Sequence, residues 1–395
     1  MEDLIAAPDL AKLYTDNGLF AKIIDTPAEE ATRRGFELET SDKRTAEFCS
    51  EEMERLAWDE AATTAIKWAR LFGGALCVIL IDDGGDLADP VDLQGIRGIA
   101  GIRVYESSIV GPAFGDTEDP ADPPRFQVFS KAGAFTVHRS RCLVFRNNTV
   151  PEGSREEKHI LWGVSEYERM SGEIFNAEHT SGAAVKLLTC STQGVYKAKH
   201  LSALLSTEDG EQQLSRRIEA LDLMRGMFQT VAVDQEESYD FAAADFAGLK
   251  DTVNASLSIL SAVSRIPPQI LYGTPESHGL NSWTFRDGRR QYSMTARELW
   301  QAYIAKIQHS MLKGNTRRLA SLILQMGTNT GELIETARDI KVNFPPIWEA
   351  RNREDIKLAE AKAQLTRAKT AAEYVKSGVL TSQEVRRILS ANGTK

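Results

Sequence analysis

The spacing of hydrophobic positions changes at residue 73. Across residues 44–72 the apolar side chains recur at helical intervals, so that Leu56, Ala65 and Phe72 would share one buried stripe. The glycine pair at 73–74 interrupts this pattern, because glycine favours the end of a helix. These positions predict one long amphipathic helix that ends at the glycine pair.

Short β-like segments follow. Residues 75–81 are continuously apolar and lead into a turn of Asp and Gly residues, which suits a strand buried on both faces. Further β-like segments at 101–105, 125–129 and 135–145 are separated by loops rich in Pro and Asp. This part of the chain predicts a mixed α/β domain.

The pattern becomes helical from residue 163 onward. Residues 214–228 and 249–263 each carry one amphipathic face. Between them, residues 229–233 and 239–241 are β-like and flank a polar turn. The expected local structure is a pair of helices on either side of a small β hairpin.

Proline and glycine divide the rest of the chain. The proline pair at 267–268 stops the second helix, and residues 270–288 are a loop rich in Gly, Ser and Asn. A long helix is expected over 289–326 and a short strand over 340–344. Residues 348–389 are rich in Ala, Lys and Glu and predict a helical tail.

Composition limits the function more than the fold. The chain has 395 residues, of which 42% are hydrophobic and 26% charged, an ordinary globular balance for two or three structural regions. The formal net charge of -9 argues against a surface built to grip DNA, although an acidic lining would let DNA slide past. The N-terminus does not resemble a signal peptide, and no apolar run approaches the ~20 residues of a membrane span, so we expect a soluble protein without membrane contact.

Candidate chemistry is sparse. The four cysteines lie far apart, and the Asp residues between 82 and 92 lack the spacing of a calcium loop, so we interpret that segment as a solvated turn. His138 and Ser140 form a single His-x-Ser, whereas two-histidine phosphoesterases need two such elements. The chain has no phosphate-binding P-loop, nucleophile elbow or His-Glu-x-x-His motif. We therefore expect no enzymatic activity, no cofactor and no metal.

Six segments in order resemble the phage portal proteins. The resemblance is to a branch known first as phage-associated proteins of unknown function and sometimes named with an anti-CBASS-like protein. It extends over residues 33–389, nearly the whole chain. The segments are Ala69-Arg-Leu-Phe-Gly-Gly-Ala75, Val137-His-Arg-Ser-Arg-Cys-Leu-Val-Phe145, Leu161-Trp-Gly-Val-Ser165, Arg265-Ile-Pro-Pro-Gln-Ile-Leu-Tyr-Gly273, Gly279-Leu-Asn-Ser282 and Lys376-Ser-Gly-Val-Leu-Thr-Ser-Gln-Glu-Val-Arg386.

The resemblance implies an α+β, portal-like fold. Such a fold has a mixed α/β wing, a helical stem, a small β clip and a helical C-terminal crown. The corresponding boundaries are 1–203 for the wing, 204–227 and 244–268 for the stem helices, 228–243 for the clip, 269–288 for the tunnel loop region, 289–347 for the long helix and the wing return strand, and 348–395 for the crown.

The resemblance also implies a function. Portal subunits form a ring, usually of twelve, at the capsid vertex, through which duplex DNA is packaged and ejected. The implied partners are other copies of the chain, the terminase large subunit, the major capsid and scaffolding proteins, a head-tail adaptor, and duplex DNA passing non-specifically. The implied location is the virion, after assembly in the host cytoplasm.

Three arginines are candidate DNA contacts. Arg286 lies in the tunnel loop region, and Arg289 and Arg290 directly follow it. There they would either touch phosphates in the channel or form ion pairs between subunits. Two other functions remain open. One is a phage phosphodiesterase acting on cyclic nucleotides, which would need the missing second His-x-Ser/Thr element. The other is a head-tail adaptor ring, although adaptors are usually much shorter and lack a segment like residues 267–273.

Overall fold

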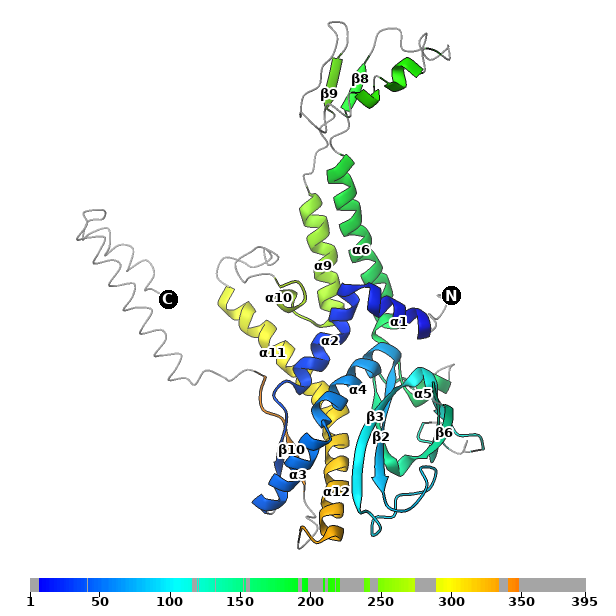
Figure 1. Ribbon diagram of the computed structural model, residues 1–395. Helices are drawn as coiled ribbons and strands as arrows, with labels where there is room; N and C mark the ends of the chain where they lie inside the picture. Colours follow the sequence, from blue (N-terminus) through cyan, green and yellow to red (C-terminus); the bar gives the residue numbers. More distant parts are fainter. Residues whose placement is uncertain are drawn as a thin grey trace, which may run out of the picture. The chain divides into compact units, whose positions relative to one another are not determined.

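The computed structural model describes most of the first 347 residues (Figure 1). The side chains of residues 188–190, 194–197, 238–241 and 289–295 are not described. The described ranges are 7–40, 42–115, 119, 121–131, 133–151, 153, 157–190, 194–197, 209, 212–216, 218–220, 238–241, 248–273, 289–333 and 340–347.

Four helices open the chain. They are α1 (Ala7–Asp16), α2 (Gly18–Thr32), α3 (Lys43–Arg55) and α4 (Trp58–Phe72). The single helix predicted over 44–72 is therefore wrong in one respect, because the chain breaks it at Ala57. This residue adopts a left-handed conformation with a φ of 50°, which a helix interior does not accommodate. The predicted end is confirmed, since Gly73 caps α4 with a φ of 89°.

Two three-stranded antiparallel sheets follow. The first has the order β3-β2-β7 and the second β4-β5-β6. The predicted strand over 135–145 is two strands in different sheets, because a short 3-10 turn at Arg139–Arg141 separates them. The strand bounds are Gly74–Asp82 for β2, Gly98–Glu106 for β3, Val110–Pro112 for β4, Arg125–Ser130 for β5, Gly133–His138 for β6 and Cys142–Arg146 for β7.

Strand β2 is buried on both faces, as its continuous apolar sequence predicts. Leu76 and Val78 belong to a core cluster shared with β4, β5 and β6 of the second sheet. Ala75 and Cys77 alternate with them and are fully buried as well, and α4 packs against β2 and β3. The first sheet therefore lies between the second sheet and a helical layer.

Two glycine-containing segments meet beside this core. The ring of Trp162 packs so closely on Gly74 that a Cβ there would lie 2.4 Å from it. Gly163 has a φ of +98° and faces the carbonyl of Asn147. Asn147 in turn donates its backbone N–H to the carbonyl of Gly73 at 3.0 Å. The close approach explains why neither glycine position has room for a side chain.

An antiparallel strand pair occurs within the segment between two packed helices. Helix α6 (Glu166–Cys190) packs against α9 (Leu249–Ser264), and β8 (Gly194–Lys197) pairs with β9 (Ser238–Phe241). The return strand predicted at 239–241 is confirmed. Its described partner is β8, which the sequence analysis did not predict, while residues 229–233 lie outside the described residues.

The predicted stem boundaries are only partly visible. Helix α9 falls inside the expected range 244–268, and the helix that packs on it is α6, which lies within the predicted wing boundaries 1–203. Of residues 204–227, the structure describes only short helical pieces at 209, 212–216 and 218–220. The domain boundaries stay a prediction.

The long helix is confirmed with one irregularity. After the short α10 (Pro268–Leu271), α11 (Arg289–Ile307) passes through a π-helical turn at Gln308–Leu312 into α12 (Lys313–Thr330). Strand β10 (Lys341–Asn343) pairs with the unpredicted β1 (Glu37–Glu39). The crown predicted over 348–395 lies outside the described residues. Over the ranges given above, no helix is long and apolar enough to cross a bilayer.

A buried ion pair holds the loop after β2. The two carboxylate oxygens of Asp83 accept hydrogen bonds from Arg141 Nη2 at 3.0 and 2.7 Å, and both side chains are almost fully buried. Asp83 also accepts backbone N–H groups of Gly85 and Asp92. Burial opposes the charge, yet these bonds hold the pKa of Asp83 below its usual value. Our interpretation of this segment as a solvated turn is wrong for Asp83.

A second buried ion pair joins the helices. The guanidinium of Arg70 on α4 lies 3.1 Å from Glu166 Oε1 at the start of α6. Arg70 also donates to the hydroxyl of Tyr303 on α11 at 2.9 Å and to the carbonyl of Ile23 on α2 at 3.0 Å. Burial opposes the charge of Arg70, but Glu166 and Tyr303 keep its pKa above the usual value. One side chain thus links α4 to three other helices.

The Asp83–Arg141 pair should make stability depend on pH. In Asp83→Asn the buried Arg141 loses its counter-charge, and we expect the free energy of unfolding to fall by about 3 kcal/mol at neutral pH. Because folding lowers the pKa of Asp83, the wild type has the full stabilisation above about pH 4 and loses it as the pH falls through the folded pKa. The difference in free energy of unfolding between the wild type and Asp83→Asn should therefore become smaller at acidic pH. Urea unfolding across this range measures it, and Asp82→Asn at the exposed neighbouring position is the control. A difference that stays constant with pH would contradict the assignment.

The Arg70–Glu166 pair should behave as one unit in a double-mutant cycle. Arg70→Met leaves Glu166 buried without a cation, and we expect a loss of about 3–5 kcal/mol. The double variant Arg70→Met/Glu166→Leu should recover part of this loss, because no unpaired charge remains. Thermal or urea unfolding of the four proteins measures the coupling. Strictly additive losses would show that the pair is not coupled.

Candidate functional site

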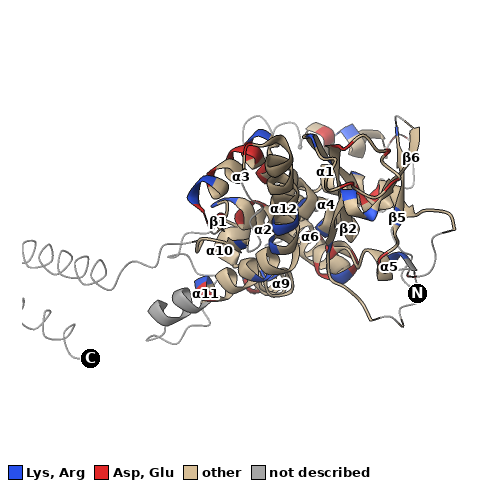
Figure 2. Ribbon diagram, turned by 90° about the horizontal axis from the view of Figure 1, so that it is seen from below, with Lys and Arg blue, Asp and Glu red and all other residues tan. Residues whose placement is uncertain are grey.

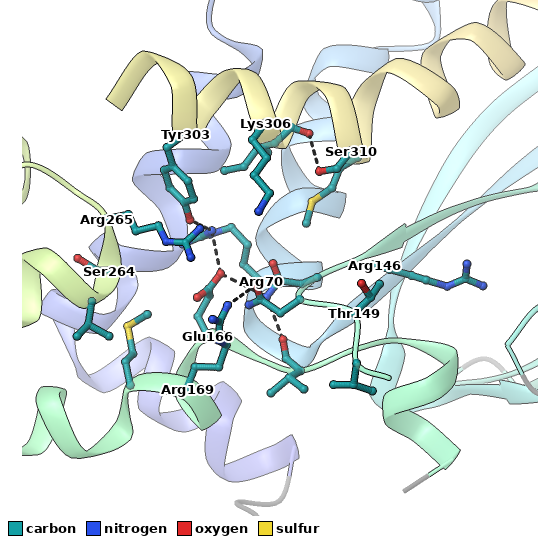
Figure 3. Close-up of a pocket in the computed structure, with 18 of the residues that line it drawn as sticks. Arg70, Arg146, Thr149, Glu166, Arg169, Ser264, Arg265, Tyr303, Lys306 and Ser310 are labelled. Carbon is teal, nitrogen blue, oxygen red and sulfur yellow. Dashed lines mark hydrogen bonds and ion pairs between the residues drawn. The ribbon is translucent and has the colours of Figure 1, made fainter. Parts of the chain in front are cut away.

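A pocket of about 740 Å³ lies where α4, α6, α9 and α11 approach one another (Figure 3). Its wall includes Arg70 from the last turn of α4 and Glu166 from the first turn of α6. Residues 147–151 from the loop after β7, 263–265 from the end of α9, and Tyr303 from α11 also line it. The wall is thus built from segments that are far apart in the sequence.

The floor of the pocket is held by the buried acid. Glu166 Oε1 accepts hydrogen bonds from Arg70 Nη1 at 3.1 Å and from Asn147 Nδ2 at 3.3 Å. Asn147 is itself anchored, because the same amide donates to the carbonyl of Val164 at 3.0 Å. The hydroxyl of Ser165 accepts the backbone N–H of Glu168 and so begins α6 at this point. The local sequence after Trp162-Gly163 therefore sets where the carboxylate lies.

The rim is cationic. Arg265 ends α9 in a left-handed conformation with a φ of 60°, and its guanidinium lies 5.7 Å from the ring centre of Tyr303. Arg169 donates to Asn148 Oδ1. Figure 3 shows Arg169, Arg265 and Lys306 directed toward the pocket, whereas Arg146 points away from it. The side chain of Arg146 is occupied elsewhere, because it donates to the carbonyl of Leu161 at 2.7 Å and pairs with Asp122.

Charge in the pocket differs from charge on the rest of the described surface. Figure 2 shows Lys and Arg interspersed with Asp and Glu along the helices and strands. The wall of the pocket instead carries Arg70, Arg146, Arg169, Arg265 and Lys306 against one acid, Glu166. Such a site attracts anions, since field lines from several cations converge in a recess that is partly shielded from water.

The side chains of the arginines proposed from the sequence lie outside the part of the chain that the structure describes. Arg286 lies outside the described residues. Arg289 and Arg290 are the first residues of α11, and their side chains are not described. The pattern of the sequence does not single out Arg169, Arg265 or Lys306 as site residues. Arg265 opens one of the portal-like segments, which could have drawn attention to it, but helical spacing gives no sign that Arg169 and Lys306 meet.

The single His-x-Ser element stabilises a turn. His138 Nδ1 lies 2.9 Å from Ser140 Oγ and accepts the backbone N–H of Ser140 at 3.2 Å. The hydroxyl of Ser140 also accepts the N–H of Val91. These contacts tie the 3-10 turn after β6 to the loop after β2, and they give both side chains a structural role.

Comparison with known proteins gives one match over most of the chain. The sequence profile of the phage portal protein family matches residues 8–368. The chain is 26% identical over 365 residues to a protein named anti-CBASS protein Acb1 from Sphingomonas paeninsulae, with 89% of this chain and 55% of that protein covered. A protein of the same name from Caulobacter sp. (strain RHG1) is 26% identical over 328 residues, covering 78% and 49%. The chain thus spans about half the length of these curated relatives.

Solved structures resemble the fold. A chain in the neck of an empty gene transfer agent particle aligns with a TM-score of 0.50 at 13% identity, covering 99% of this chain and 94% of that one. This likeness supports the mixed helix and sheet architecture predicted from the sequence. Because the family profile covers residues 8–368 of the 395, the chain belongs to the phage portal protein family.

Proposed function

We propose that this chain is the portal subunit of a phage capsid vertex, where copies form a ring around a channel for duplex DNA. The observation that carries the proposal is the family match over residues 8–368. The ring would receive DNA from a terminase and pass it on through a head-tail adaptor. The chain would contribute surfaces for assembly, with no catalytic step of its own.

The paired helices support this proposal. Helices α6 and α9 would form the stem, and the β8–β9 pair, which occurs between them in the sequence, would belong to the clip. Both helices carry large apolar side chains that are exposed to solvent. Phe175 on α6 is 62% exposed and Ile259 on α9 is 56% exposed. Exposed apolar groups on one helical pair are typical of a surface that another chain covers, and a ring needs such head-to-tail contacts.

Assembly is the direct test. We expect the purified chain to form particles with a mass that is a large multiple of its 43.7 kDa, with a central hole in negative-stain images. Phe175→Glu should weaken assembly at least tenfold in concentration, because the new charge would have to be buried between chains. Native mass spectrometry over a wide range of concentrations measures this.

Asn176→Glu is the matched control, since it places the same charge on the adjacent exposed position of α6. A wild-type chain that stays monomeric at every concentration would contradict the proposal. Equal effects of the two substitutions would remove Phe175 from the interface.

The three arginines near the tunnel loop give a second test. We propose that Arg286, Arg289 and Arg290 contact DNA phosphates in the channel. Replacing them by Gln should impair packaging while leaving the ring assembled. Each lost phosphate contact should also reduce the steepness of log K for DNA binding plotted against log salt concentration by about 0.9. Arg103→Gln, on an exposed position of β3, is the control. Rings that fail to assemble would instead indicate ion pairs between subunits.

The name of the relatives favours one alternative, a phosphodiesterase that acts on cyclic nucleotides. Those proteins are about twice as long as the region they share with this chain, so the name describes proteins with a large part that this chain does not match. His138 and Ser140 would have to be catalytic in that case. Hydrolysis of cyclic oligonucleotides by the purified chain, abolished by His138→Ala, would overturn the proposal of a purely structural subunit.

A further inference from the structure

Three cations at the pocket rim have no acidic partner among the described residues. Two other cations of the pocket form ion pairs, Arg70 with Glu166 and Arg146 with Asp122. Within the described part of the chain, two of the remaining three cations contact only neutral groups and the third has no bonded partner. Arg169 bonds to the amide oxygen of Asn148, Arg265 lies over the ring of Tyr303, and Lys306 has no bonded partner there.

A hydrogen-bond donor without a partner in the described part of the chain lies in the wall of the pocket. Asn148 Nδ2 is buried and meets no acceptor among the described residues, and Asn148 lines the pocket. The orientation of this amide follows from chemistry, because its other atom faces Arg169, which can only donate. A buried donor without an acceptor costs about 1–3 kcal/mol. The pocket therefore combines a donor that has no acceptor with three cations that have no acidic partner among the described residues.

The cations come from three elements that the fold brings together. Arg169 is on α6, Arg265 ends α9 and Lys306 is on α11. Like charges directed into one space repel each other, and because the three side chains are exposed, water screens part of this repulsion. An anion that bonds to all three would turn this repulsion into attraction and would tie the three helices to one another.

The chemistry favours phosphate as that anion. A phosphate offers acceptor oxygens in several directions, which suits guanidinium groups that approach from different sides. A single carboxylate has two oxygens in one plane and would leave donors unmet. The volume of about 740 Å³ exceeds the size of one phosphate and falls in the range of sites for small organic ligands. We propose that this pocket binds a phosphate group, carried either by inorganic phosphate or by a mononucleotide.

Binding to the full chain tests the proposal directly. Isothermal titration at constant ionic strength would use inorganic phosphate, a nucleoside monophosphate and the same nucleoside without phosphate, with sodium chloride as the ionic control. We expect both phosphate compounds to bind saturably and the bare nucleoside and chloride not to bind. Tighter binding of the monophosphate would identify a nucleotide as the source, and equal binding would identify free phosphate.

Substitutions locate the site. Lys306→Gln and Arg169→Gln are at exposed positions of folded helices, and each should weaken phosphate binding about tenfold, the usual effect of losing one charge-assisted hydrogen bond. Lys313→Gln is the matched control, because Lys313 is also exposed, lies on the following helix α12 and does not line the pocket.

Three outcomes would overturn the proposal. The first is absence of phosphate binding to the wild type. The second is an equal loss of affinity in Lys313→Gln, which would indicate general attraction by surface charge. The third is a change in the mass of the assembly in Lys306→Gln or Arg169→Gln without any phosphate binding, which would show that carboxylates of a second copy meet these cations. A ring that assembles normally and binds no phosphate would remove this inference while leaving the portal function intact.

Discussion

The buried ion pair between Arg70 and Glu166 is the interaction on which the arrangement of the helices depends. An arginine that is 1% exposed is stable only if every part of its guanidinium meets an acceptor. Here the acceptors come from α2, α6 and α11, while Arg70 itself is on α4, which packs on the first sheet. The start of α6 therefore has a defined position relative to the first sheet, because any shift would leave a buried charge without its counter-charge.

Two of the portal-like segments, 69–75 and 161–165, meet in space beside this pair. Gly73 and Gly74 lie against Trp162 and Gly163, and Arg70 precedes the first pair as Glu166 follows the second. Arg141, from another of these segments, is buried against Asp83. These contacts explain the residue types by packing and charge compensation.

The two proposals draw on different parts of the same helical pair. The exposed apolar side chains of α6 and α9 are suited to another copy of the chain, and the end of α9 and the start of α6 contribute Arg265 and Arg169 to the cationic pocket. Acidic residues outnumber basic ones in the chain as a whole, so the gathering of cations in the pocket is a property of the fold. It arises because three helices end or pass at one place.

The sequence by itself determined the elements whose signals are local. The buried strand β2, the helix end at Gly73, helix α9 and the long helix through α11 and α12 follow from hydrophobic period, glycine and proline, and the order of short segments indicated the portal family. Tertiary structure alone decided what depends on distant partners: the break at Ala57, the pairing of β1 with β10 and β8 with β9, the burial of Asp83, and the pocket. Hydrophobic period reports which side of an element is buried, but not what it is buried against. Charges that are far apart in the sequence, such as Arg169 and Lys306 at a separation of 137 positions, line one pocket only once the chain has folded.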